Sequence, residues 1–141
     1  MNKKHFISIF IAFLLLFFNC GYMVTGSGNV ITVNLEDVSF KNISISHGCE
    51  AEISRSDTSR VTIYIDDNIE QFVIKKIENG TLSIGLDSYH SYNPTKFKAV
   101  ISCPSVSVVE GSGGSVLKIS GFNDTSDAQL SLSGGSRING D

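Results

Sequence analysis

Apolar and polar residues alternate along most of the chain after residue 28. In residues 31–35, aliphatic side chains at every second position are separated by Thr and Asn, and residues 61–65 and 82–86 repeat the pattern. Such alternation predicts β-strands with one buried face and one face in water, because successive side chains of a strand point to opposite sides. No apolar stripe with helical spacing is long enough there to predict a helix, so we expect an all-β domain.

Turn residues separate the predicted strands. Asn79-Gly80 lies between Ile77 and residues 82–86, and Asn-Gly is the pair that a two-residue β-hairpin favours. We therefore predict a hairpin there. Further turns are expected at His47-Gly48, Asp66-Asp67-Asn68 and Asn93-Pro94.

The composition changes at residue 110, and 14 of the 32 residues from 110 to 141 are Gly or Ser. Residues 109–117 align with residues 130–138 at an offset of 21, and both segments carry Gly-Gly-Ser between aliphatic positions. A repeat of this length with short strands predicts successive coils of a β-solenoid. Glycine suits the corners, where the backbone needs a positive φ or a close approach.

The N-terminus has the layout of a secretory signal peptide, with Lys3 and Lys4 before an apolar run over residues 6–18. Cys20 lies where bacterial lipoproteins carry their acylated cysteine, and the stretch resembles a lipobox, although Phe18 and Asn19 replace its usual small residues. We expect Cys20 to be a lipid anchor, with an uncleaved helix or simple secretion as alternatives. With a lipid anchor or an uncleaved helix, the membrane is a partner of the chain.

These boundaries divide the chain into a signal peptide or anchor (1–19), a short linker (20–28) and a β domain (29–141) with Gly/Ser-rich turns from residue 110. Export permits disulfides. Cys49 and Cys103 share the apolar parity of their predicted strands, so both thiols should point inward. Either they form a disulfide or they are two separate buried thiols.

Removing residues 1–19 also removes two lysines and leaves 9 Lys/Arg against 14 Asp/Glu, a net charge of −5. An acidic chain of this kind excludes nucleic acid as a partner, since cations that neutralise phosphates provide that affinity.

The residues indicate no enzyme. His47 and His90 lack a nucleophile motif, and the Gly-Ser turns lack the Lys or helix of a nucleotide-binding loop. Glu50 with Glu52, or Asp66 with Asp67, would be the carboxylate pairs of a polysaccharide-cleaving enzyme, an alternative that needs a cleft and a shifted pKa. Asp66-Asp67-Asn68 lacks the spaced oxygen ligands of a calcium loop and favours a plain turn. We expect no cofactor, no catalytic residue and no metal site.

Residues 87–95 form the segment most suited to recognition. Tyr89, His90, Tyr92 and Asn93 gather there in one polar loop, and Tyr combines contact area with a hydroxyl group at low entropic cost. We predict a binding loop for a surface glycan or protein. The alternative is that the tyrosines cover the end of the core.

Four segments, taken in order, resemble the head GIN domain family of auto-transporter adhesins: residues 26–30, 79–84, 99–106 and 110–113. The resemblance covers residues 26–141. It implies an all-β fold similar to a single-stranded right-handed β-helix, here preceded by an N-terminal signal helix, and an exported protein without enzyme activity. Many members of the family are lipoproteins.

The function we predict from the sequence is that of a lipid-anchored adhesin or binding module at the cell surface. A structural scaffold of the cell envelope is the alternative. The sequence stops soon after its second Gly-Gly-Ser turn. Either the chain is a shortened form of the family, or its last coil packs on something else, and we expect self-association of two copies through the C-terminal edge of the solenoid in that case.

Overall fold

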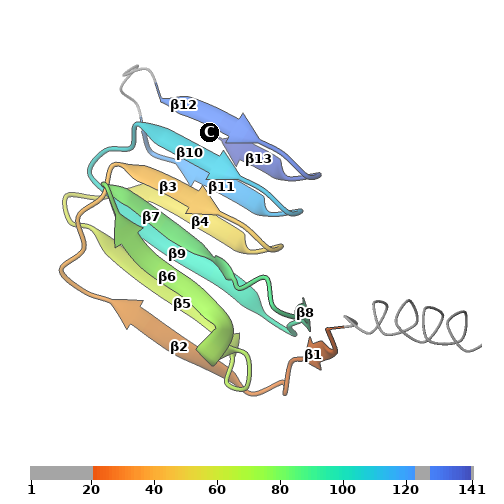
Figure 1. Ribbon diagram of the computed structural model, residues 1–141. Helices are drawn as coiled ribbons and strands as arrows, with labels where there is room; N and C mark the ends of the chain where they lie inside the picture. The colour runs from red at the N-terminus through yellow and green to blue at the C-terminus, as the bar shows by residue number, and fades with distance from the viewer. Residues whose placement is uncertain (1–20, 123–127, 141) are drawn as a thin grey trace, which may run out of the picture.

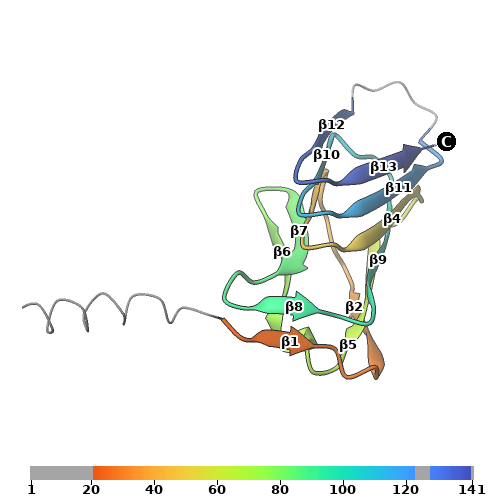
Figure 2. The ribbon, with the colours of Figure 1, turned by 90° about the vertical axis from the view of Figure 1, so that its right-hand side faces the viewer.

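The computed structural model describes residues 21–122 and 128–140, which form two β-sheets packed face to face (Figures 1 and 2). The predicted signal peptide and Cys20 lie outside the described residues. The five-stranded sheet has the order β12 (Gln129–Leu132), β10 (Val108–Gly111), β3 (Asn42–Ile45), β7 (Thr81–Leu86) and β6 (Val73–Glu78). The six-stranded sheet has the order β13 (Arg137–Gly140), β11 (Val116–Ser120), β4 (Glu50–Arg55), β9 (Phe97–Cys103), β5 (Arg60–Asp66) and β2 (Val30–Leu35). β1 (Met23–Thr25) and β8 (Ser91–Asn93) form a separate parallel pair, and η2 (Glu70–Phe72) is one turn of 3₁₀ helix.

The prediction of an all-β domain is confirmed, and so is the hairpin at Asn79-Gly80. β6 and β7 pair antiparallel with Glu78 opposite Thr81, and both turn residues have a positive φ. This is the backbone that the right-handed twist of a two-residue hairpin requires, and Asn and Gly tolerate it best.

Four chain segments cross from the five-stranded to the six-stranded sheet, namely β3 to β4, β7 to β9, β10 to β11 and β12 to β13. Their strands stack parallel and in register. Val109 pairs with Leu130 and Leu117 with Ile138, so the 21-residue repeat places equivalent residues side by side. The β3–β4 segment is a third copy of this repeat, which the sequence analysis did not identify.

A β-helix with coils stacked in chain order is not confirmed. β3 and β4 lie between the β7–β9 segment and the β10–β11 segment, although they precede both in the sequence. In addition, β2, β5 and β6 pair antiparallel with their neighbours. The domain is therefore a two-sheet stack of parallel crossings, closed on one side by antiparallel strands.

In three of the four crossings, a two-residue turn joins the strand in one sheet to the strand in the other. These turns lie above one another at one end of the molecule (Figure 1). They are His47-Gly48, Gly113-Gly114 and Gly134-Gly135, and every one of these residues has a φ between 59° and 79°. A Cβ atom on Gly113 would lie 3.1 Å from the backbone nitrogen of His47, and one on Gly134 would lie 3.0 Å from that of Gly113. The turns thus stack backbone on backbone.

The core between the two sheets is aliphatic. Its largest fully buried side chains are those of Ile43, Ile45, Ile53, Ile63, Ile65, Ile69, Leu82, Ile84, Leu86, Ile101, Leu117 and Val61. These residues occupy the apolar positions of the alternating pattern, so each strand turns one face inward as the period of two requires.

Cys49 and Cys103 are also buried, and both thiols are free. Cys103 pairs with Arg55 in the register of β9 on β4, whereas Cys49 comes just before Glu50, the partner of Lys98. The two cysteines are thus separated by about 20 Å along the ladder at roughly 3.3 Å per residue. Burial raises the pKa of Cys49 to about 12 and raises that of Cys103 as well. Both side chains therefore stay protonated at neutral pH and are poor nucleophiles.

We predict that Gly113→Ala lowers the free energy of unfolding more than Gly114→Ala does. Both glycines have a positive φ, which costs an L residue roughly 1–2 kcal/mol. Only at Gly113 would the new Cβ also press on a neighbouring backbone, because nothing lies within 4 Å of the Cβ position at Gly114. Urea unfolding of both variants, followed by circular dichroism, measures the difference. Equal losses would contradict backbone stacking of the turns.

Candidate functional site

The segment that follows Cys20 and Gly21 is locked onto the domain by the turn after β5. Asn68 accepts a hydrogen bond from the Ser27 backbone N–H at 2.9 Å and donates one to the Thr25 carbonyl oxygen at 2.9 Å. Asp67 accepts hydrogen bonds from the Ser27 hydroxyl at 2.5 Å and the Asn29 amide at 2.8 Å. The predicted turn at Asp66-Asp67-Asn68 therefore also holds the N-terminal segment.

Asp66 is the buried centre of this arrangement and has no exposed surface. Its carboxylate accepts hydrogen bonds from the Gly28 N–H at 2.8 Å and, in the connection just before β9, from the Thr95 N–H at 2.8 Å and the Thr95 hydroxyl at 2.5 Å. A Cβ on Gly26 would overlap this carboxylate. Burial by itself raises the pKa of Asp66, but the hydrogen bonds from Thr95 and Gly28 outweigh it and hold the pKa below its usual value.

The connection from β7 to β9 takes the place that the other crossings fill with a two-residue turn. It contains β8, which pairs with β1 so that Met23 lies opposite Ser91. The Gly26 N–H also donates a hydrogen bond to the Asn93 carbonyl oxygen at 2.9 Å. The predicted binding loop and the N-terminal segment are thus one structural unit.

Within this unit, His90 and Tyr92 turn inward. The Tyr92 ring packs on Phe72 with ring centres 5.4 Å apart, and its hydroxyl donates a hydrogen bond to the Asp87 carboxylate. Burial and this bond to Asp87 raise the pKa of Tyr92, and the same bond lowers the pKa of Asp87. The His90 ring lies 5.3 Å from that of Phe72.

Other side chains of the unit face outward. Tyr89 is 82% exposed, Tyr22 68% and Met23 62%. Tyr22 lies edge-on to His90 with ring centres 5.1 Å apart. Of the two predicted loop tyrosines, Tyr92 therefore supports the loop and Tyr89 is available for contact. Tyr22 and Met23 join the exposed surface, and sequence reasoning missed them because they precede the domain it recognised.

The carboxylates of Glu50 and Glu52 lie on the outer face of the six-stranded sheet between two lysines. Lys118 on β11 contacts Glu50 at 3.0 Å, and Lys98 on β9 contacts Glu52 at 2.8 Å. The hydrogen bond from Lys118 lowers the pKa of Glu50, and that from Lys98 lowers the pKa of Glu52. Both carboxylates stay ionised at neutral pH, whereas a general acid needs a raised pKa. In residues 21–122 and 128–140, no group of three or more His, Cys, Asp or Glu side chains could hold a metal ion.

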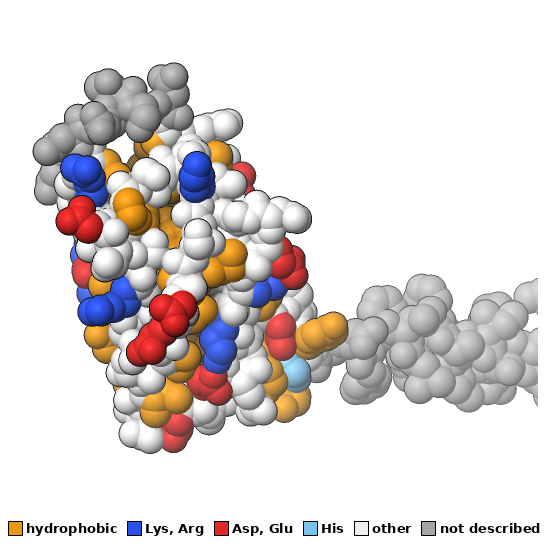
Figure 3. Space-filling model, turned by 90° about the vertical axis from the view of Figure 1, so that its left-hand side faces the viewer, with side chains coloured by type: hydrophobic (Ala, Val, Ile, Leu, Met, Phe, Trp, Pro, Cys, Tyr) orange, Lys and Arg blue, Asp and Glu red, His pale blue; other side chains and the backbone are white. Residues whose placement is uncertain are grey.

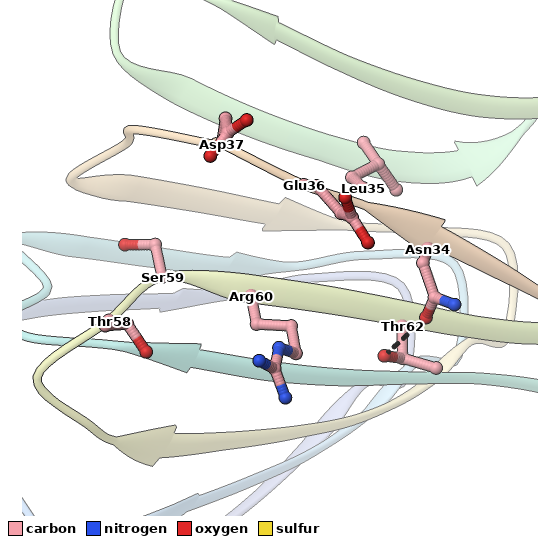
Figure 4. Close-up of a pocket in the computed structure, with 8 residues that line it drawn as sticks. All are labelled: Asn34, Leu35, Glu36, Asp37, Thr58, Ser59, Arg60 and Thr62. Carbon is pink, nitrogen blue, oxygen red and sulfur yellow. Dashed lines mark hydrogen bonds between the residues drawn. The ribbon is translucent and has the colours of Figure 1, made fainter.

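An open hollow of about 610 Å³ lies where β2 ends and β5 begins (Figure 4). β2 runs away from β1, so this hollow is at the opposite end of the molecule (Figure 1). Its lining is polar apart from one leucine and consists of Asn34, Leu35, Glu36, Asp37, Thr58, Ser59, Arg60 and Thr62.

The lining residues come from two neighbouring strands and the turns that follow or precede them. The Thr62 hydroxyl donates a hydrogen bond to the Asn34 side-chain oxygen at 3.0 Å. Figure 3 looks onto this end of the molecule, where acidic and basic side chains are interspersed over the face among apolar ones. Sequence reasoning missed the hollow because polar residues at strand ends look like ordinary turns.

The C-terminal edge is formed by β12 and β13, where Leu130 and Leu132 are 52% and 39% exposed. Self-association through this edge stays a prediction. In the part of the chain that the structure describes, no helix has the length and apolar character needed to span a bilayer.

Comparison with known proteins gives one family. The model of DUF2807, described as "Putative auto-transporter adhesin, head GIN domain", matches residues 39–141. No curated protein matches the sequence.

Solved structures share the fold. They include a putative lipid binding protein from Parabacteroides distasonis (TM-score 0.65, 21% identity, 70% of this chain and 44% of that one) and a putative adhesin from Parabacteroides merdae (0.62, 21%, 69% and 41%). A putative adhesin from Bacteroides fragilis is similar over 84% of this chain and 55% of its own, with a TM-score of 0.66 and 19% identity. The chain thus spans about half the length of these structures, or less.

We predict that Asp66→Asn lowers the free energy of unfolding by about 2 kcal/mol or more at neutral pH, because one hydrogen bond to a charged group contributes about 1.5–3 kcal/mol. Asp67→Asn, in the same turn but exposed, should cost less. Since the pKa of Asp66 is lowered on folding, its contribution is present above its usual value of 3.8 and is lost as the pH falls below it. Urea unfolding at neutral and at acidic pH tests this, and a difference between native chain and variant that does not shrink with acid would contradict it.

Proposed function

The chain belongs to the head GIN domain family of putative auto-transporter adhesins, and from this premise we propose that it is an exported, lipid-anchored protein that binds a partner at the cell surface. The arrangement of its two ends is the observation that carries the proposal. The N-terminal segment is locked at one end of the domain, and the polar hollow lies at the other.

The locked segment supports anchoring close to the membrane. Asp66 and Asn68 fix residues 25–28 to the domain, so only a few residues separate Cys20 from the folded body. An acyl group on Cys20 would hold the β1 end at the bilayer. The end that carries the hollow would then face away from the membrane, toward other cells or their secreted material.

The chemistry of the hollow favours a glycan as the partner. Glu36 and Asp37 offer carboxylate oxygens, Arg60 offers guanidinium donors, and the remaining lining adds one amide and three hydroxyl groups. Dense donors and acceptors in an open hollow suit a ligand rich in hydroxyl groups. The name of the Parabacteroides distasonis relative raises lipid as another class of ligand, but with Leu35 as the single apolar lining residue this hollow is poorly suited to an acyl chain.

We propose binding without catalysis. Glycoside cleavage needs one carboxylic acid that stays protonated near neutral pH. Two carboxylate pairs were considered from the sequence. Glu50 and Glu52 are each bound by a lysine and have lowered pKa values. Hydrogen bonds also hold the pKa values of Asp66 and Asp67 below their usual value. A role in the envelope scaffold remains the second prediction from the sequence.

We predict that Cys20→Ser abolishes the attachment of lipid to the chain. Acylation of the Cys20 thiol requires its sulfur, which serine lacks. Metabolic labelling with palmitate and mass spectrometry of the mature N-terminus measure the modification, and Cys49→Ser serves as the matched control because that thiol is buried. An unlabelled native chain, or label retained in Cys20→Ser, would contradict anchoring through this residue.

A second experiment tests the hollow. Cells that display the full chain are applied to a glycan array, and we expect Arg60→Ala and Glu36→Gln to weaken binding about tenfold, which corresponds to losing one charged hydrogen bond. Arg137→Ala is the control, since Arg137 is an exposed arginine on β13 at the far edge of the same sheet. Binding that survives both hollow variants unchanged, or no glycan binding by the native chain, would overturn this assignment.

A further inference from the structure

Exposed large apolar side chains gather at the corner formed by β1 and the loop before β8. The described residues contain six such side chains, those of Tyr22, Met23, Val30, Tyr89, Leu130 and Leu132. Three of them, Tyr22, Met23 and Tyr89, belong to this corner, and they are the three most exposed. We call these three residues the corner surface. Soluble domains rarely leave their largest exposed apolar groups together without a partner.

The corner surface stands on a rigid base. Behind it, Phe72, His90 and Tyr92 pack ring against ring, with centres 5.3 to 6.0 Å apart. The Asp87 carboxylate binds the Tyr92 hydroxyl and accepts a hydrogen bond from the Tyr89 N–H at 3.1 Å. The pairing of β1 with β8 joins the strand that carries Met23 to the loop that carries Tyr89. The aromatic packing, the Asp87 hydrogen bonds and the strand pairing therefore fix the backbone from which the exposed tyrosines project.

The corner surface lies close in sequence to the predicted membrane anchor, and this proximity indicates which partner covers it. Gly21 lies against the backbone of Tyr89, since a Cβ there would be 3.2 Å from the Tyr89 carbonyl oxygen. Tyr22 is two residues from Cys20, and two residues of chain span at most about 7 Å. The 13-residue apolar run at 6–18 ends just before that. Whatever membrane receives the lipid or the apolar run must therefore lie beside the corner surface.

We propose that Tyr22, Met23 and Tyr89 insert into the headgroup region of the bilayer that holds the N-terminus. Tyrosine suits this region because its ring is apolar and its hydroxyl group remains hydrated, and tyrosines gather at membrane interfaces for that reason. The proposal rests on membrane anchoring of the N-terminus as put forward above. It makes the 87–95 loop a membrane contact that orients the domain, and the glycan site is left to the hollow at the far end.

The contact does not depend on charge. The three inserting side chains are neutral, and the acidic group behind them, Asp87, is bound by Tyr92. We therefore expect the interaction to persist at high salt, unlike that of a basic patch with anionic lipids.

The absence of tryptophan from the chain gives a direct test. The full-length Tyr89→Trp variant is reconstituted through its own N-terminus into vesicles of phosphatidylethanolamine and phosphatidylglycerol. We expect its emission to shift to shorter wavelength and to be strongly quenched when the acyl chains carry bromine near the headgroup. Met23→Trp should behave in the same way. Leu130→Trp is the matched control, because Leu130 is exposed on β12, three strands away from β7, and should stay unshifted and unquenched.

Flotation of the same vesicles separates the two proposals. If the protein floats with the vesicles but the Tyr89→Trp and Met23→Trp variants emit as Leu130→Trp does, anchoring stands and the membrane contact is overturned. If the protein does not float, anchoring and the membrane contact both fail. Quenching of the Tyr89→Trp and Met23→Trp variants but not of Leu130→Trp, unchanged by salt, supports the contact.

Discussion

The buried carboxylate of Asp66 determines how the N-terminal segment joins the domain. It accepts hydrogen bonds from both sides, from Gly28 in the incoming segment and from Thr95 just before β9. A carboxylate without exposed surface is costly unless such bonds replace its hydration. The backbone must therefore come close to it, and Gly26 allows this because it has no side chain. The path of residues 26–28 across the domain follows from this one requirement.

The stack of crossings explains where the 87–95 loop lies. In three crossings the chain passes between the sheets through two residues with positive φ, and at two levels a Cβ would press on the turn beside it. The crossing from β7 to β9 is the first in the stack and has a parallel crossing on one side only, so it can carry a longer connection at this end. That connection includes β8, and β1 adds to it as a second parallel strand. The corner surface therefore belongs to the same end as the stacked turns (Figure 1).

The strand pattern, the Asn79-Gly80 hairpin and the 21-residue repeat could be predicted from the sequence because all three are local or nearly identical signals. The order of the crossings could not be predicted, because alternation shows which face of a strand is buried and not which strand lies beside it. The β3–β4 copy escaped notice since His47 replaces the first glycine of its turn and it lies far from the other copies in the chain. Its signal was the Ser-His-Gly-Cys segment, which matches Ser-Gly-Gly-Ser in position and in φ. The hollow had no signal at all, because Glu36 and Arg60 meet only through the pairing of β2 with β5.

The chemistry of the two ends agrees with the orientation that the covalent chain imposes. Placing the hollow against a bilayer would strip water from Glu36, Asp37 and Arg60, and lipid tails offer no hydrogen bonds in exchange. Placing the corner surface there removes water from two aromatic rings and a thioether, which is favourable at roughly 25 cal/mol per Å² of apolar area. Neither end would be stable in the place of the other. The Asp66 contacts hold the N-terminal segment at the end of the domain that carries the apolar corner. The connectivity of the chain and the solvation of its side chains therefore favour the same arrangement at a membrane.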